Sequence, residues 1–168
     1  HSFPTRRSSD LVIALDWKWL FIYPEQHIAT VNYLALPLNS QVEFWMTTDN
    51  VPMSALFVPQ LGSQIYAMAG MRTKLHLVAN QIGTYEGLNS QFNGDGFSDM
   101  HFKVDVMDAT QLQLWFNQVR SMQKPLDDAA YQQLLNPTVG DKPQYYSEAS
   151  ADLFQSVLHL YKIGRAHV

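Results

Sequence analysis

The polar segment at residues 89–102, NSQFNGDGFSDMHF, gathers side chains that could bind a metal. Asn93, Asp95 and Asp99 alternate in the way that oxygen ligands of a hard cation do. A calcium loop also needs an acid at its twelfth position, and counted from Asn93 that position is Val104. Asn-Gly and Asp-Gly are strong turn dipeptides because glycine accepts a positive φ. The composition of this segment therefore favours a turn over a calcium site.

The other residues with catalytic or ligand chemistry lack an informative spacing. Away from the chain ends there are four histidines, and none forms an HxH or HExxH pattern: His27, His76, His101 and His159. His76 and His101 fall on the polar faces of predicted strands, which indicates exposure to solvent. Ser54, Ser63 and Ser90 lack the G-x-S-x-G context of a hydrolase nucleophile.

The tetrad DWKW offers two indole rings, Trp17 and Trp19. Rings at this spacing could form a platform for sugar stacking or for electron transfer. Tryptophans at strand spacing are more often core or interface residues, because they bury a large apolar area. We expect the second role here.

The chain of 168 residues contains no cysteine. This excludes disulfides, zinc–thiolate sites, blue copper and thiol nucleophiles, all of which need a cysteine sulfur. The absence of cysteine does not identify a cellular compartment.

Both ends of the chain resemble translated sequencing adapters rather than protein. HSFPTRRSSDL at the start and IGRAHV at the end match the two adapters of a common library in frame, with Lys162 as the junction codon. We therefore expect residues 1–11 and 162–168 to be artefacts and leave them out of fold reasoning. The natural part is then an internal fragment of a longer reading frame.

Excluding these ends changes the charge. The 11 basic residues fall to 7 and the 15 acidic residues to 14, so the net charge moves from −4 to near −7. No basic patch remains, and a nucleic-acid partner is not expected because phosphate binding relies on Lys and Arg. No run of 18 apolar residues occurs, so the sequence predicts no membrane-spanning helix within it.

Apolar residues alternate along the first two thirds of the chain. In VIALDWKWLF, one predicted strand places Ile13, Leu15, Trp17, Trp19 and Phe21 on one face. Further strands are predicted in ATVNYLAL, QVEFWMT, SALFVP, TKLHLVAN, GTYEGL and HFKVDVM. Six or seven short strands separated by turn residues favour an antiparallel β-sandwich or barrel.

The periodicity becomes helical at Asp108. DATQ has the form of a capping box, and the apolar residues that follow it lie on one helical face up to Lys124-Pro125. LDDAAYQQLLNP predicts a shorter helix, and SEASADLFQSVLHLY predicts a third that begins with a serine cap. The intervening NPTVGDKPQYY is expected to be an irregular link. The sequence thus predicts a mainly β domain at residues 12–107 and a helical, aromatic-rich extension at residues 108–161.

The segment from Pro59 to Val104 contains two short motifs, PQLG at residues 59–62 and GTYEG at residues 83–87. They match the P-x-L-G and G-x-Y-x-G anchors of subunit II of the haem–copper respiratory oxidases, which this segment resembles. In the family a dinuclear copper loop, C-x-E-x-C-x-x-x-H-x-x-M, begins two residues after the second anchor. A further histidine ligand lies five residues before the first anchor.

When the family's copper loop is aligned with this chain, only one of its ligand residues is retained. The two cysteine positions hold Asn89 and Asn93, the two histidine positions hold Ser54 and Phe97, and the glutamate position holds Gln91. The methionine is kept as Met100. The resemblance therefore implies a copper loop of unchanged length that has lost both thiolates and both imidazoles, and we expect no metal at these positions.

The sequence elsewhere is similar to that of the ubiquinol oxidase branch of the family, of the cytochrome bo type. DWKWLFIYPEQHIATVN, LGSQIYAMAGM and the aromatic-rich tail carry this resemblance, which covers essentially all of residues 12–161. Asp99 departs from the glycine expected before the methionine. The resemblance implies a cupredoxin-like Greek-key β-sandwich or barrel with a C-terminal helical extension.

The resemblance also implies a function. The domain is expected on the periplasmic face of a bacterial inner membrane, with two transmembrane helices upstream of Val12. The whole complex would oxidise ubiquinol, reduce oxygen to water and pump protons. This chain would be a non-catalytic subunit without a cofactor, docked on subunit I, which would carry the haems, the copper and the quinol site.

Two other functions remain open from the sequence. One is a copper-binding electron-transfer domain of a cytochrome c oxidase subunit II. The other is a carbohydrate-binding β-sandwich that stacks sugars on Trp17, Trp19 and Trp45.

Overall fold

A computed structural model describes residues 8–49, 51, 53–91, 96 and 99–163. Its first part contains ten strands: β1 (Ser8–Leu15), β2 (Lys18–Tyr23), β3 (Ile28–Val31), β4 (Tyr33–Pro37), β5 (Gln41–Thr48), β6 (Ser54–Val58), β7 (Ser63–Ala67), β8 (Thr73–Val78), β9 (Gly83–Asn89) and β10 (His101–Met107). A short 3-10 helix, η1 (Pro59–Leu61), follows β6. The second part holds α1 (Ala109–Arg120), α2 (Asp128–Leu134), β11 (Gln144–Tyr146) and α3 (Asp152–Ile163).

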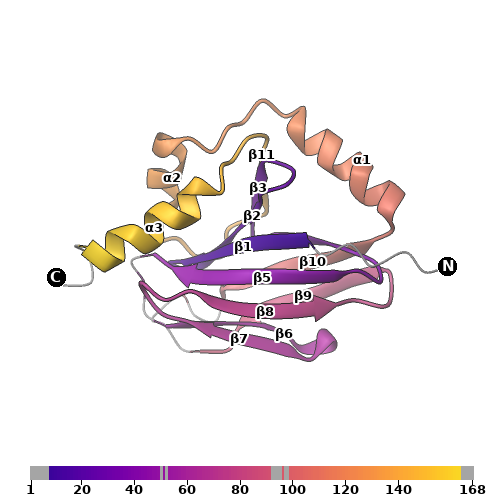
Figure 1. The fold of residues 1–168 in the computed structure, drawn as a ribbon, viewed down its shortest axis with the longest axis horizontal. Coiled ribbons are helices and arrows are strands. Elements are labelled where there is room, and N and C mark those ends of the chain that lie inside the picture. The colour runs from indigo at the N-terminus through magenta and orange to yellow at the C-terminus, as the bar shows by residue number, and fades with distance from the viewer. Residues whose placement is uncertain (1–7, 50, 52, 92–95, 97–98, 164–168) are drawn as a thin grey trace.

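The strands form two sheets. One has the order β11-β3-β2-β1-β5-β8 and the other the order β4-β10-β9-β6-β7. Figure 1 shows the three helices on one side of this sandwich and β6 and β7 on the opposite side. The expected two-sheet, mainly β architecture is confirmed, but the sheets are mixed rather than antiparallel, since β1 runs parallel to β5 and β4 runs parallel to β10.

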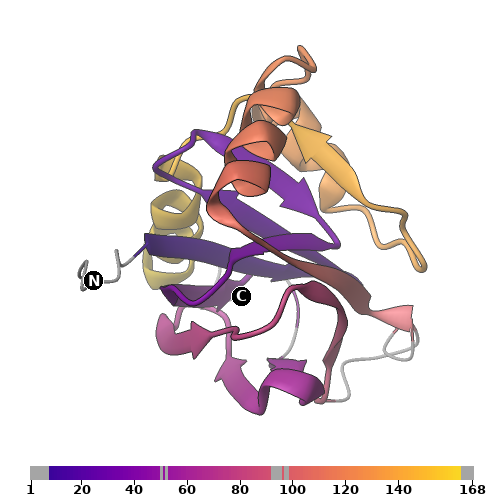
Figure 2. The same ribbon diagram turned by 90° about the vertical axis from the view of Figure 1, so that its right-hand side faces the viewer.

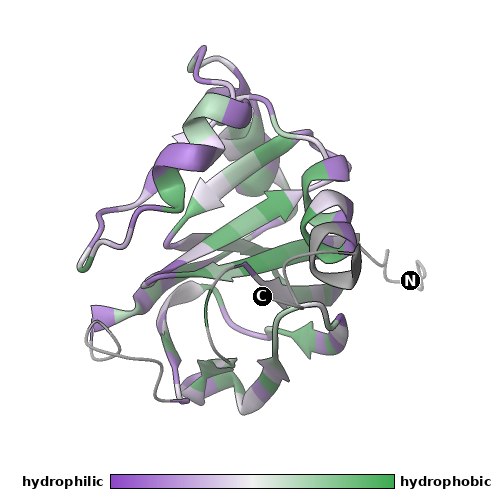
Figure 3. Cartoon of the chain, turned by 90° about the vertical axis from the view of Figure 1, so that its left-hand side faces the viewer, coloured by the Kyte–Doolittle hydropathy of each residue, from purple (hydrophilic) through white to green (hydrophobic). Residues whose placement is uncertain are grey.

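Two hydrophobic cores hold these layers together. The first lies between the two sheets and includes Phe21, Phe44 and Phe102, with α1 adding residues such as Phe116. The second lies on the outer face of the larger sheet, where α2 and α3 pack residues such as Phe154 against β1 and β2. Figure 3 shows the strands as mostly hydrophobic and the helices as mixed, as expected when helices cover a sheet with one apolar face.

Two expected strands are in fact pairs of strands. VIALDWKWLF turns at Asp16-Trp17, and β1 and β2 pair antiparallel on either side. The turn reverses the faces, so Ile13 and Leu15 join the outer core while Trp19 and Phe21 join the inner one. Alternation could not reveal this, because all six residues of β2 are buried.

ATVNYLAL is likewise divided, at Asn32, whose φ of 57° lies in the left-handed region. The residue ends β3 in one sheet and leads into β4 in the other. Asparagine tolerates this conformation better than most residues. The turn therefore allows one apolar stretch to serve both layers of the sandwich.

Other expectations from the sequence are confirmed. The inward residues of β5 and β10 are buried, with Val42, Phe44 and Met46 on the first of these strands. Asp108 caps α1 by accepting a hydrogen bond from the backbone nitrogen of Gln111 at 2.8 Å. The expectation that NPTVGDKPQYY is only an irregular link is wrong at its end, where QYY forms β11 and adds an edge strand beside β3.

The helical part folds back onto the sandwich. Figure 2 shows α1 and the β11 segment lying together over the strands. Trp115 of α1 packs its ring 5.5 Å from that of Tyr33 and 6.3 Å from that of Tyr145. Within the described residues no helix is long and apolar enough to cross a bilayer.

Candidate functional site

The expected ligand positions that the structure describes lie at the ends of neighbouring strands. Ser54 begins β6, Asn89 ends β9, and Met100 immediately precedes β10. These strands are neighbours in the smaller sheet, and Asn89 pairs with Leu56 of β6. Asn93 and Phe97 lie outside the described residues. The fold thus brings together Ser54, Asn89 and Met100, although Ser54 and Met100 are 46 positions apart in the sequence.

Asn89 is the centre of this cluster. Its side chain is almost completely buried, and its Oδ1 accepts hydrogen bonds from the backbone nitrogens of Ala55 at 2.9 Å and Gln91 at 3.0 Å. Its Nδ2 donates to Sδ of Met100 at 3.4 Å. One amide therefore joins the start of β6, the segment after β9 and the methionine before β10.

Met100 is a core residue in this arrangement. Its side chain is fully buried, and its carbonyl oxygen accepts from the backbone nitrogen of Asn89 and from Nε1 of Trp19, both at 3.2 Å. Ser54 is also fully buried at the start of β6. The polar groups of this cluster are directed at other protein groups, as buried polar groups usually are.

The donor set does not suit a dinuclear copper centre. The described positions offer a hydroxyl, two amides and a thioether, from Ser54, Asn89, Gln91 and Met100. Such centres need thiolates, and the chain has no cysteine. Across the part of the chain that the structure describes, no three His, Asp or Glu residues are close enough to bind a metal together.

Two glycines shape the surroundings of the cluster. A Cβ on Gly96 would lie 2.2–2.6 Å from three ring atoms of Trp17, and a Cβ on Gly87 would lie 2.0–2.4 Å from the ring of Phe102. Each glycine therefore lets an aromatic ring pack directly on the backbone. The sequence showed these glycines as turn residues or anchors, but only the structure shows the rings against them.

The structure does not support the sugar-stacking platform. Trp19 is fully buried, and Trp17 packs on Gly96. The ring of Trp45 is covered by Arg72, with the guanidinium carbon 4.6 Å from the ring centroid. Sugar stacking requires exposed ring faces. Trp19 presents none, and the half-buried rings of Trp17 and Trp45 are each packed against another group.

Asp99, the described member of the candidate calcium set that the sequence disfavoured, is exposed, and its backbone nitrogen donates to the carbonyl of Gly96 at 3.1 Å. This is the hydrogen bond of a turn, as the glycine-rich composition indicated. Asn93 and Asp95 lie outside the described residues.

Lys18 connects the sandwich to the C-terminal part, a role that the sequence did not reveal. Its side chain is 1 % exposed, and its Nζ donates to the carbonyl oxygens of Leu134 at 2.9 Å and Asn136 at 2.8 Å. Burial lowers the pKa of Lys18, while the nearby Asp141 and Asp16 carboxylates act in the opposite direction. A positive charge here also suits the carboxyl end of α2.

A second contact reaches the segment that leads into Ser54. The hydroxyl of Tyr131, on α2, donates to Oδ2 of Asp49 at 2.5 Å, and both residues are buried. The backbone nitrogen of Asp49 in turn donates to the carbonyl of Ala14 at 3.1 Å. The C-terminal part therefore supports the same end of the sandwich that carries the Asn89 cluster.

The smaller sheet makes a third contact with the C-terminal part, through Tyr33 of β4. Tyr33 donates to Oδ2 of Asp105 at 2.6 Å, while Trp115 and Tyr145 pack against its ring. Burial, followed by the hydrogen bond to Asp105, raises the pKa of Tyr33. Tyr33 is therefore a neutral hydrogen-bond donor at physiological pH.

One side of the same end is apolar and exposed. Tyr66 of β7 is 49 % exposed, and Met68 and Met71 in the following turn are 44 % and 45 % exposed. Ala67, between them in sequence, pairs with Ser54. These three residues, called the Tyr66–Met71 patch below, adjoin the strand that starts at the Asn89 cluster.

The chain is similar to proteins of known family. A family model described as the COX Aromatic Rich Motif matches residues 120–164. Cytochrome bo(3) ubiquinol oxidase subunit 2 of Pseudomonas putida is 48 % identical over 151 residues, covering 90 % of this chain and 48 % of that protein. Ubiquinol oxidase subunit 2 of Acetobacter aceti is 44 % identical over 154 residues, covering 91 % of this chain and 49 % of that protein.

The fold is also found among solved structures. The periplasmic domain of subunit II of cytochrome oxidase from Bradyrhizobium japonicum matches with a TM-score of 0.63 at 17 % identity, covering 66 % of this chain and 91 % of that one. This likeness establishes the shared fold and confirms the cupredoxin-like fold that the resemblance implied. The chain spans about half the length of the curated relatives that it matches.

Proposed function

The chain belongs to the ubiquinol oxidase subunit 2 family, and on that premise we propose that it is the periplasmic domain of subunit II in a proton-pumping ubiquinol oxidase. In this role it sits on the outer face of a bacterial inner membrane and carries neither a copper centre nor a catalytic residue. Haems and copper belong to subunit I, where quinol is oxidised and oxygen is reduced to water. The identity of 48 % over 151 residues with a subunit of this name supports the assignment.

One observation supports the part of the proposal that this chain holds no copper. Asn89 stands where the family's copper loop has a cysteine, and its amide makes three hydrogen bonds that tie β6, the loop and Met100 together. A metal centre would join the same segments through coordinate bonds. The amide supplies this connection in a chain that has no thiolate to offer a metal.

The domain boundaries are part of the proposal. Residues 12–107 form the cupredoxin-like domain, and residues 108–161 form the aromatic-rich extension that stiffens it. The contacts of Lys18, Tyr131 and Tyr33 with their partners across this boundary support a single rigid unit. The adapter-like ends, residues 1–11 and 162–168, are not part of the natural protein, which continues upstream into two transmembrane helices.

Subunit I is the partner in this proposal. The Tyr66–Met71 patch is the surface that docks on it, because it gathers three exposed apolar side chains within six residues, and exposed apolar patches mark interaction sites. Methionine suits such a contact, since its flexible thioether adapts to the opposite surface. The proposed role of the domain is therefore assembly of the complex and not electron transfer.

Purification of the complex tests this role. The full-length subunit with Met68→Glu and Met71→Glu should recover far less subunit I than the parent does, because each change places a charge in an apolar contact. Val139→Glu is a matched control, since Val139 is an exposed apolar residue, at 54 %, on the C-terminal extension. Full recovery of subunit I with the double variant would refute the patch, and no recovery with the parent itself would refute the proposed function.

A further inference from the structure

Asp10 on β1 has a side chain that faces the interior. It lies two and four residues before Val12 and Ala14, which belong to the core between the sheets, and alternate residues of a strand share a face. Asp10 pairs with Phe44 of β5 in the parallel register and is 7 % exposed. The strand therefore aims a carboxylate at an apolar layer.

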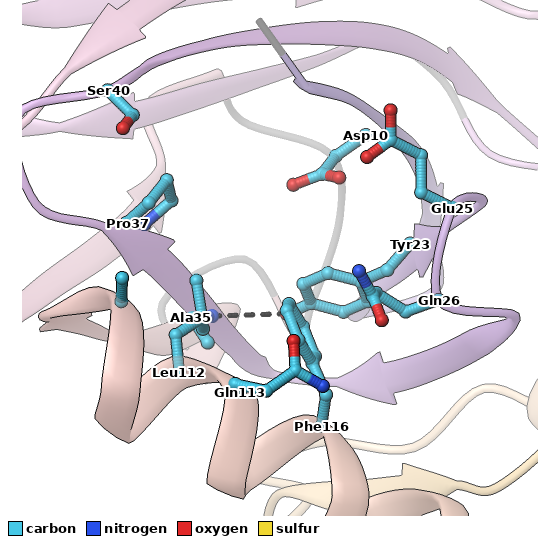
Figure 4. A pocket seen from close by; sticks show the side chains of 11 residues that line it. Asp10, Tyr23, Glu25, Gln26, Ala35, Pro37, Ser40, Leu112, Gln113 and Phe116 are labelled. Carbon is cyan, nitrogen blue, oxygen red and sulfur yellow. Dashed lines mark hydrogen bonds between the residues drawn. The ribbon is translucent and has the colours of Figure 1, made fainter. Parts of the chain in front are cut away.

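The side chain borders a pocket of about 290 Å³. Apolar groups from β4 and α1 line much of it, among them Ala35, Pro37, Leu112 and Phe116. Figure 4 shows the carboxylate of Asp10 pointing into the open centre of the pocket, with Tyr23 and Glu25 beside it. The hydroxyl of Tyr23 is already engaged by the backbone nitrogen of Ala35 at 3.1 Å.

The surroundings of the Asp10 carboxyl group do not stabilise its charge. It makes no hydrogen bond or ion pair with any residue that the structure describes, and the neighbouring charge, Glu25, has the same sign. Burial, with a further contribution from Glu25, raises the pKa of Asp10 to about 8. Aspartate is seldom buried without a partner, because an unpaired charge loses its hydration.

We propose that this pocket is the seat of the natural segment just upstream of Val12, and that an apolar side chain at position 10 fills its inner part. The adapter-like residues 8–11 continue β1 in register but place Asp10 where that side chain belongs. The occupant is a segment of this protein's own chain, which extends well beyond the present sequence in its relatives. The proposal rests on the adapter interpretation and is independent of the role in the oxidase.

A β-branched side chain such as isoleucine meets the requirements of the site. It favours strand conformation and adds apolar volume to the pocket without a polar group that needs a partner. Isoleucine at position 10 would also lie next to the aromatic ring of Phe44, with which this position is paired. A small-molecule ligand is the competing occupant of the pocket. In that case the natural residue at position 10 could be polar.

Thermal unfolding of three variants separates filling of the pocket from removal of the charge. Asp10→Asn removes the ionisable group at nearly constant size, whereas Asp10→Ile also fills space. His76→Ile adds the same side chain to an exposed position of β8 and controls for strand preference. We expect Asp10→Ile to raise the melting midpoint at pH 7 by about 5 °C or more over that of the parent. Its midpoint should also be higher than that of Asp10→Asn at both pH 5 and pH 7.

The outcomes are distinct. An Asp10→Ile midpoint equal to or below that of Asp10→Asn would overturn the proposal, because charge alone would then explain the site. An equal gain from His76→Ile would overturn it as well. The natural gene gives a direct check: the codon two places before that of Val12 should encode an apolar residue, and a polar or charged residue there would refute the assignment.

Discussion

Replacing Asn89 with leucine tests whether its amide organises the end of the sandwich. The two side chains have similar size, so the change removes hydrogen bonds while it keeps volume. The backbone N–H groups of Ala55 and Gln91 would lose their acceptor, and Met100 would lose its donor. Asn89 is 2 % exposed, so water cannot easily replace these bonds.

The magnitude follows from the two backbone donors. An unsatisfied buried donor costs about 1–3 kcal/mol, and the apolar surface of leucine offsets part of this, so we expect a net loss of about 3 kcal/mol. For a domain of this size the melting midpoint would fall by about 6–12 °C.

Urea unfolding and thermal melts followed by circular dichroism measure the effect. Asn80→Leu is the control, because Asn80 is an exposed asparagine between β8 and β9. A loss for Asn89→Leu that does not exceed that of Asn80→Leu would refute the reasoning, since the amide would then contribute nothing to the fold.

Three further changes probe other contacts. Lys18→Met leaves the carbonyls of Leu134 and Asn136 without their donor, and we expect faster proteolysis after α2 together with a loss of about 2–4 kcal/mol in urea unfolding. Gly96→Ala places a Cβ within 2.6 Å of the Trp17 ring, and a changed near-ultraviolet spectrum should report the displaced indole. Because the pKa of Asp10 is raised from 3.8 to about 8 in the folded chain, the folded state holds a proton that the unfolded state releases, so stability should fall by up to about 1.4 kcal/mol per pH unit between these values. Asp10→Asn should remove that slope from urea titrations, and an unchanged slope would exclude Asp10 as its source.

The sequence predicted the elements whose two faces differ. Period-two alternation identified β5 and β10 because one face of each points to the inner core and the other is less buried. The capping residue Asp108 was predicted for a local reason, its hydrogen bond to the backbone of Gln111. These features depend on near neighbours in the chain.

The elements that were misread depend on distant partners. Alternation placed Ile13 and Trp19 on one strand face because nothing local marks the turn at Asp16-Trp17. The alternation of Lys18 with Trp17 and Trp19 indicates a polar face for it, but its Nζ is bonded to carbonyls of residues 134 and 136, more than a hundred positions later. The second core, formed when α2 and α3 cover the larger sheet, is the cause of both differences.

The site shows the same division. Ser54, Asn89 and Met100 were grouped through a family resemblance, and no spacing rule would have brought them together. The structure places Asn89 and Met100 in contact and starts β6 beside them. The hydrogen bonds of the amide could not be predicted, because they depend on the side-chain geometry of a finished fold.

Copper binding by the purified domain is the most direct test of the central claim. The parent chain and a variant with Ser54→His, Asn89→Cys, Asn93→Cys and Phe97→His would be loaded with copper and examined by metal analysis and visible absorption. We predict that the parent retains no stoichiometric copper, while the variant gains a purple dinuclear centre from the four introduced ligands. Two copper ions per parent chain with that absorption would contradict the account.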